Sequence, residues 1–162
     1  PHSHVYEVNS RQFRDHDLRV LVSSEEADIH LATSADGFRF VFFQGHPEYD
    51  AVSLFKEYKR EVMRYVSGER TVYPPFPEHY FSREATRILN HFRDKVLAAE
   101  GGVSMQSFPE AEVVPLLDNT WSDTGKAVVN NWLGLVYQLT SSDRHRAFMK
   151  NIDPQNPLAG MW

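Results

Sequence analysis

The sequence predicts an α/β protein, and three observations carry that prediction. Three short segments rich in β-branched and aromatic residues, at 18–23, 28–33 and 38–45, have the composition of strands. An Asp-Gly turn within 34–37 joins the last two of these segments as a hairpin. Further along the chain, apolar residues recur at spacings of three and four, which is typical of amphipathic helices.

Three main helices are expected after the strands. The first follows an N-cap at Asp50 and continues to Val66, with Gly68 as its stop. The second follows the cap Ser82, and its apolar face continues to Ala99, just before a Gly-Gly pair. Each helix therefore has a start signal and a stop signal in the sequence.

The third helix is expected over 126–139. Its apolar residues, Trp132 among them, occupy most sides of the helix, so the sequence predicts that it is buried. Ahead of it, Pro109 and Pro115 bracket what is expected to be one helical turn. The segment 73–81 holds three prolines and predicts a rigid, extended loop, whose aromatic residues either line a pocket or pack the loop against the core.

Composition narrows the class of protein. The chain has 162 residues, of which 41% are hydrophobic and 24% charged, as in ordinary globular proteins. Its net charge of -5 gives no basic field for nucleic acid, and no apolar run approaches the roughly 18 residues of a membrane span. The polar first residues do not resemble a signal peptide, and the lack of cysteine makes a cytoplasmic location the default expectation. Without a Ser/Gly linker, residues 1–162 are expected to form a single unit.

The strongest chemical signal follows the third predicted strand. His46 and Glu48 lie one residue apart, between the strand and the first helix, and ligands bind beyond the carboxyl ends of strands in open α/β sheets. A neutral histidine can take a proton from a nucleophile and return it, and a nearby carboxylate can hold its tautomer. On spacing alone, a loop histidine beside a surface acid is the favoured explanation of the pair.

Longer stretches resemble a known family. "GHPE" after an apolar strand resembles the histidine-glutamate segment of the class I glutamine amidotransferase-like superfamily. "GHPEYDAVSLFKEYKRE", residues 45–61, resembles the homoserine O-acyltransferases, which include homoserine O-succinyltransferases and their acetyl-transferring relatives. "PHSHVYEV" at 1–8, "YPPFPEHYF" at 73–81 and "NTWSDTGKAVVNNWLGLVYQLT" at 119–140 are similar to further segments of that family, in the same order.

This resemblance implies both a fold and a reaction. The fold would be the C-terminal portion of a flavodoxin-like sheet of the class I glutamine amidotransferase-like type, with a β-hairpin and three main helices. The reaction would be ping-pong transfer of a succinyl or acetyl group from acyl-CoA to the hydroxyl of L-homoserine, in methionine biosynthesis. His46 would act as general base and acid within a Cys-His-Glu triad, and Glu48 would orient it.

The resemblance also implies partners. Arg60 stands where the family uses an arginine to bind the homoserine carboxylate, a task suited to a guanidinium; its spacing alone favours a solvated face shared with Lys56 and Arg64. Acyl-CoA would be a co-substrate, with no bound cofactor. The protein would be a homodimer without nucleic-acid or membrane partners.

The sequence departs from the family in three respects. The family's nucleophilic cysteine lies upstream of the "PHS" segment, so these residues resemble the C-terminal half of such an enzyme and are expected to be inactive alone. His4 replaces the family's usual arginine. Residues 82–118 exceed the family's short form and are expected to be an inserted helical region, a lid or an interface.

Other functions remain open at this point. A glutamine amidotransferase-type hydrolase would use the same histidine-glutamate pair, and a non-catalytic binding module could keep the same fold. A metal site is not expected, because His2, His4, His16 and His30 match no trusted ligand spacing.

Overall fold

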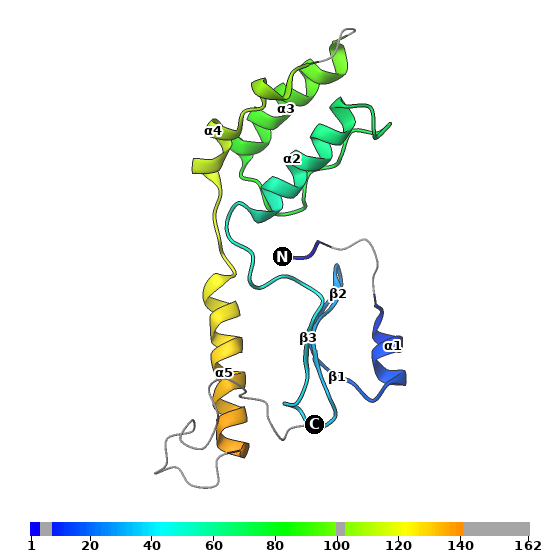
Figure 1. Ribbon diagram of the computed structural model, residues 1–162, viewed down its shortest axis with the longest axis vertical. Coiled ribbons are helices and arrows are strands. Elements are labelled where there is room, and N and C mark those ends of the chain that lie inside the picture. The colour runs from blue at the N-terminus through cyan, green and yellow to red at the C-terminus, as the bar shows by residue number, and fades with distance from the viewer. Residues whose placement is uncertain (4–7, 100–102, 141–162) are drawn as a thin grey trace, which may run out of the picture. The chain divides into compact units, whose positions relative to one another are not determined.

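The computed structural model describes residues 1–3, 8–99 and 103–140. It confirms a mixed α/β protein with an antiparallel sheet of three strands and five α-helices in this part of the chain (Figure 1). The elements in chain order are α1 (Ser10–Asp15), β1 (Arg19–Ser24), β2 (Asp28–Thr33), β3 (Val41–Phe43), α2 (Ser53–Val66), α3 (Arg83–Ala98), η1 (Met105–Ser107), α4 (Glu110–Val113), η2 (Val114–Leu116) and α5 (Ser122–Thr140).

Contacts between Cα atoms divide the chain into two compact units. The sheet unit comprises residues 2–47 and 123–162, and the helical unit comprises residue 1 with residues 48–122. We predicted one unit from the sequence; whether both units belong to one acyltransferase domain stays a prediction.

The sheet unit is built on consecutive antiparallel strands in the order β1-β2-β3. The predicted hairpin between the second and third segments is confirmed, with Leu31 opposite Phe43 and Thr33 opposite Val41. β3 is shorter than the predicted strand 38–45, because the residues before Val41 belong to a turn. In that turn the Asp36 carboxylate accepts hydrogen bonds from two backbone N–H groups, which are thereby unavailable to the sheet.

The core of the sheet unit lies between α1 and β2. Phe13 of α1 is 8% exposed, and Ile29 and Ala32 of β2 are fully buried. The backbone N–H and hydroxyl of Ser10 both donate to the Asp28 carboxylate, which joins the start of α1 to the start of β2. The sequence did not predict α1, because six residues with one buried aromatic show no helical period.

The helix α5 is largely exposed, whereas the sequence predicted that it is buried. It extends from Ser122 to Thr140, around the predicted 126–139, but among its described residues only Gly125 is buried. Leu133 and Leu139 are 53% and 57% exposed. The prediction that this helix is buried is therefore wrong for the described residues, because an apolar composition shows that a helix suits burial without showing what covers it.

The helical unit has a separate core between α2, α3 and the segment 105–117. Phe55 and Val62 of α2 and Leu89 of α3 are fully buried there. Phe108 stacks on Phe55 with ring centroids 5.7 Å apart. Figure 1 shows α2 and α3 lying side by side, with α4 against α3.

The proline-rich segment 73–81 packs against this core. The ring of Phe76 lies 5.3 Å from that of Tyr58, and the ring of Phe81 lies 6.1 Å from that of Phe55. The hydroxyl of Tyr80 donates to the carbonyl of Ala51. Of the two interpretations of these aromatic residues, packing of the loop is the one that the contacts support.

Helix boundaries follow the predicted signals with one exception. Ser82 caps α3 by accepting a hydrogen bond from the Ala85 N–H at 3.1 Å, and Gly68 follows α2 with φ of 81°. The predicted N-cap at Asp50 is wrong, because its carboxylate accepts the Val52 N–H and the Ser53 hydroxyl in an Asx turn. α2 consequently begins at Ser53.

The described residues of 82–118 contain helices, as predicted. They include α3, η1, α4 and η2, and α4 is the helical turn that the two prolines bracket. The status of this region as an insertion stays a prediction. The Gly-Gly pair 101–102, His4 and the tail beyond residue 140 lie outside the described residues.

Candidate active site

His46 lies where the sequence placed it, three residues after the end of β3. Its ring is half-buried, and Gly45 before it is buried. The Nε2 atom lies 3.2 Å from the carbonyl oxygen of Ser3, in the "PHS" segment. The strand end thus presents an imidazole that the first residues of the chain hold in place.

The partner of His46 Nε2 determines what each ring nitrogen can do. A carbonyl oxygen only accepts, so Nε2 carries the proton in this hydrogen bond. In the neutral ring, Nδ1 is then the basic nitrogen. For Nε2 to take a proton, as a base paired with Glu48 through Nδ1 would do, the tautomer has to change and the bond to Ser3 has to open.

α5 approaches the segment of His46 closely. A Cβ atom placed on Gly125 would lie 3.1 Å from the carbonyl oxygen of Pro47 and 3.2 Å from its Cβ. Both distances are shorter than most real Cβ contacts, so a side chain at Gly125 would displace this segment or the helix. The first turn of α5 therefore supports the residue that follows His46.

In the helical unit, two donors hold the residue after Glu48. The carbonyl of Tyr49 accepts from Trp121 Nε1 at 2.8 Å and from Asn119 Nδ2 at 3.2 Å. The Asn119 side-chain oxygen in turn accepts the Ser122 N–H at 2.9 Å, at the start of α5. No pattern in the sequence predicted this role for Trp121, although "NTW" belongs to a segment that resembles the family.

The Tyr49 side chain adds a third attachment, to α2. Its hydroxyl donates to Glu57 Oε1 at 2.7 Å, and this bond, with partial burial, raises the pKa of Tyr49 to about 12. The negative charge of Glu48 also raises that pKa, and the positive charge of Arg60 lowers it. Glu48 and Arg60 are therefore both close enough to act on the same phenol.

Arg60 projects from α2 with 61% of its side chain exposed. Its Nε lies 3.5 Å from the Glu61 carboxylate, but Glu61 also binds Arg70 at 2.6 Å. Because exposed ion pairs of this kind contribute little, the long pair with Glu61 leaves the Arg60 guanidinium available to a carboxylate ligand. Lys56 and Arg64 are exposed on the same helix, as the solvated-face interpretation expects.

The three candidate residues divide between the two units. His46 belongs to the sheet unit, while Glu48 and Arg60 belong to the helical unit. Their convergence on one substrate, and the pairing of His46 with Glu48, stay predictions.

His30 on β2 lies beside His2, from the first residues of the chain. His30 Nδ1 is 3.0 Å from His2 Nε2, and burial lowers the pKa of His30. Within the described residues, no group of three or more His, Cys, Asp or Glu side chains could hold a metal ion. The pair is therefore a histidine-histidine hydrogen bond, and the expectation of no metal stays a prediction.

His46, Glu48 and Arg60 belong to a mixed α/β protein, and all three lie within the segment that a family model matches. The sequence model of the family "Homoserine O-succinyltransferase" matches residues 1–142. The chain belongs to the homoserine O-succinyltransferase family.

Individual relatives agree with this membership. The chain is 56% identical over 159 residues to a homoserine O-succinyltransferase of Methylococcus capsulatus, and 52% identical to one of Methylobacter tundripaludum. It is 54% identical to one of Thioalkalivibrio nitratireducens. Each alignment covers 98% of this chain and 45% of the relative, so the chain spans about half the length of these proteins. Within its described part, no helix has the length and apolar character to cross a membrane.

Proposed function

We propose that the protein transfers an acyl group from acyl-CoA to the hydroxyl of L-homoserine. The observation that carries this proposal is the family match over residues 1–142, which includes His46, Glu48 and Arg60. Succinyl-CoA is the expected donor because the relatives are named homoserine O-succinyltransferases, and acetyl-CoA is the alternative.

The chemistry would proceed in two steps. A cysteine outside these 162 residues attacks the thioester, and CoA leaves with the proton that the cysteine had given up. The homoserine hydroxyl then attacks the acyl-cysteine, and the thiolate leaves. His46 would carry the proton in each step, and Glu48 would stabilise its charged ring.

Arg60 would determine the acceptor. Its planar guanidinium can form two parallel hydrogen bonds to the homoserine carboxylate. The charges of Arg60 and Glu48 both act on the Tyr49 phenol, so the two side chains lie near the same group, which supports this role. We expect a class I glutamine amidotransferase-like fold for the whole protein, assembled as a homodimer.

An assay of the whole protein, which includes the residues that supply the cysteine outside this 162-residue segment, tests the proposal. The protein is incubated with succinyl-CoA or acetyl-CoA and homoserine, and separately with glutamine, and the products are identified by mass spectrometry. O-acylhomoserine together with free CoA is the expected result. Ammonia from glutamine without acyl transfer would instead identify an amidotransferase-type hydrolase, and no product from any substrate would favour a binding module.

A further inference from the structure

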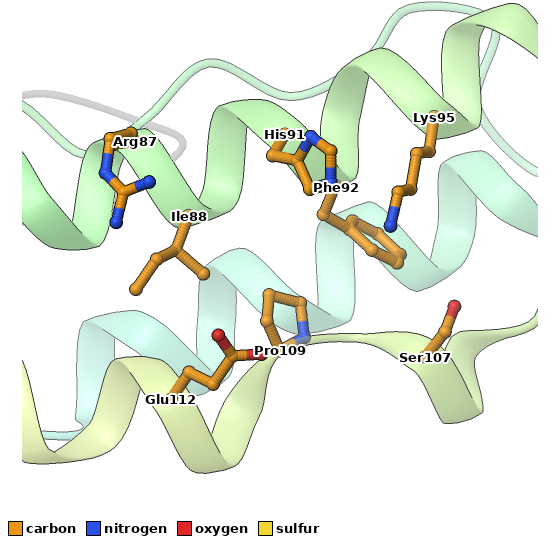
Figure 2. A pocket seen from close by; sticks show the side chains of 8 residues that line it. All are labelled: Arg87, Ile88, His91, Phe92, Lys95, Ser107, Pro109 and Glu112. Atoms are coloured by element: carbon orange, nitrogen blue, oxygen red, sulfur yellow. The ribbon is translucent and has the colours of Figure 1, made fainter.

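The helical unit carries a hollow that His46, Glu48 and Arg60 do not line. It lies between α3 and the segment 105–113 and has a volume of about 390 Å³ (Figure 2). Pockets for small molecules commonly have volumes of about 300 to 1,000 Å³. The hollow is therefore large enough to hold a substantial part of a small ligand.

One rim of the hollow is basic. Arg87, His91 and Lys95 lie four residues apart, so they share one face of α3, and Arg87 and Lys95 are separated by about 12 Å along the helix axis. Figure 2 shows the side chains of Arg87 and Lys95 extending from α3 toward the opposite wall. Arg87 pairs with Glu84 at 3.3 Å, but that exposed pair is weak and can rearrange.

The basic face continues beyond this hollow. A second hollow of about 540 Å³ shares Arg87 and His91 and reaches Arg83, four residues earlier on the same helix. Arg83, Arg87 and Lys95 thus follow one side of α3, with His91 between them, while Asp94 also lines the second hollow; the net charge of the chain is -5. A local concentration of positive charge on an acidic protein favours an anionic ligand at this place.

The floor of the hollow is apolar and firmly packed. Ile88, Phe92 and Pro109 line it. Phe92 is only 4% exposed, and its ring packs edge-on against Phe108 with centroids 5.2 Å apart. Such a floor is formed before a ligand arrives and suits the flat face of an aromatic base.

The opposite wall supplies two acceptors. The Ser107 hydroxyl donates to the carbonyl of Ser104 at 2.7 Å, so its oxygen remains able to accept. The Glu112 carboxylate points toward α3 in Figure 2. Its negative charge repels phosphate groups, which would therefore gather on the α3 side, beside Arg87 and Lys95.

We propose that this hollow binds an adenosine phosphate, with the base on the apolar floor and the phosphates along the basic rim. This inference rests on the proposed function, because the adenosine phosphate would be the nucleotide end of acyl-CoA. That end of the molecule carries a pyrophosphate and a ribose phosphate. A free adenine nucleotide offers the same chemistry and is the second source that the experiment must distinguish.

Calorimetric titration of the purified protein without homoserine tests this inference. The probes are CoA, 3′,5′-ADP and ADP. In the double variant Arg87→Gln/Lys95→Gln, the Kd for CoA is expected to rise about tenfold or more, since two charge-assisted contacts are lost. Arg93→Gln, which removes a charge from the same helix outside both hollows, is the matched control and is expected to change the Kd less than twofold.

A second variant has the opposite expected sign. Glu112→Gln removes a negative charge from the opposite wall, so it should lower the Kd for CoA. Because loss of folding cannot tighten binding, this result separates a local effect from general damage. An unchanged Kd in the double variant, or a higher Kd in Glu112→Gln, would overturn the inference.

The probes also identify the source of the nucleotide. CoA binding that exceeds ADP binding and depends on Arg87 and Lys95 supports the acyl donor, and equal binding of both with the same dependence supports a free nucleotide. If the proposed function is wrong but the hollow is assigned correctly, the result differs. CoA would still bind with the same dependence on Arg87 and Lys95, but no O-acylhomoserine would form. If only the hollow is misassigned, acyl transfer proceeds and the double variant keeps the KM for acyl-CoA.

Discussion

Substitution of the single residue Arg60 tests whether its guanidinium selects homoserine as the acyl acceptor. Arg60→Lys keeps the positive charge but removes the planar fork, so the KM for homoserine should rise about tenfold, while the KM for acyl-CoA stays the same. Steady-state kinetics with each substrate varied in turn measure both values. Arg64→Lys, one turn further along α2, is the control, and an equal rise there would show that the effect is not specific to Arg60.

Trp121 is a positioning residue in this account. Trp121→Phe keeps an aromatic ring but removes the donor to the Tyr49 carbonyl, one residue after Glu48. The expected results are a loss of about 1 kcal/mol in the free energy of unfolding and a several-fold lower kcat, with both KM values unchanged. Chemical unfolding and steady-state assays measure these quantities.

Trp132 supplies the matched control for Trp121. Its indole donates to the carbonyl of Phe38 at 2.7 Å, far along the sequence from Glu48. Trp132→Phe should therefore cost similar stability and leave kcat unchanged. If both variants lower kcat equally, the effect of Trp121 is only a loss of stability, and its positioning role is wrong.

Among the elements, the turn between β2 and β3 has a measurable electrostatic signature. Asp36 accepts from the Ser34 hydroxyl and from the Arg39 and Phe38 N–H groups, which lowers its pKa to about 2. The folded pKa lies below the ordinary value, so this stabilisation is present above about pH 4 and is lost as the pH falls toward 2.

NMR titration of the Asp36 carboxyl carbon tests that prediction. The expected midpoint is near pH 2, and Ser34→Ala should move it upward, because the largest of the three contributions is removed. An unperturbed midpoint, or no response to Ser34→Ala, would show that the turn is not held by this carboxylate.

Elements with strong local signals were predictable from the sequence. The hairpin followed from Asp-Gly chemistry, and the start of α3 from Ser82 and the apolar period after it. The N-cap prediction for Asp50 was wrong because the same carboxylate can cap a helix or close an Asx turn. Only the positions of the Ser53 hydroxyl and the Val52 N–H distinguish these two structures. α1 was missed because a helix of six residues has too few turns to show a period.

The candidate site was predictable only in part. His46 could be placed at a strand end because "GHPE" follows an apolar run, and its location there is confirmed. The role of Trp121 was not predictable, because a single tryptophan in a polar stretch has the same sequence signal whether or not its N–H donates a hydrogen bond. The Ser3 carbonyl is a backbone group 43 residues from His46, so no pattern of side chains in the sequence indicates its contact with the His46 ring.

For the molecule as a whole, the sequence was least informative about which surfaces cover the apolar residues of each helix. The composition of α5 indicated burial, yet Leu133 and Leu139 remain largely exposed among the described residues. A contiguous exposed apolar patch is typical of a contact surface, and a composition does not say whether exposed residues such as these form one.

The 162 residues alone are expected to transfer no acyl group. They contain no cysteine, so His46 has no thiol within them to activate. Purification of this chain, followed by incubation with succinyl-CoA and homoserine, measures the outcome as free CoA and O-acylhomoserine. Turnover above the rate without protein would show that transfer needs no cysteine from outside these residues and would refute the proposed route.

The central claim is that His46 carries the proton for a cysteine nucleophile supplied from outside residues 1–162. Its most direct test is intact-mass and peptide mass spectrometry of the whole protein after incubation with acyl-CoA in the absence of homoserine. The account predicts one acyl group on a cysteine outside this segment, with formation slowed about 10²- to 10⁴-fold in His46→Ala. An acyl group on a residue within 1–162, or acylation of His46→Ala at the unaltered rate, would contradict it.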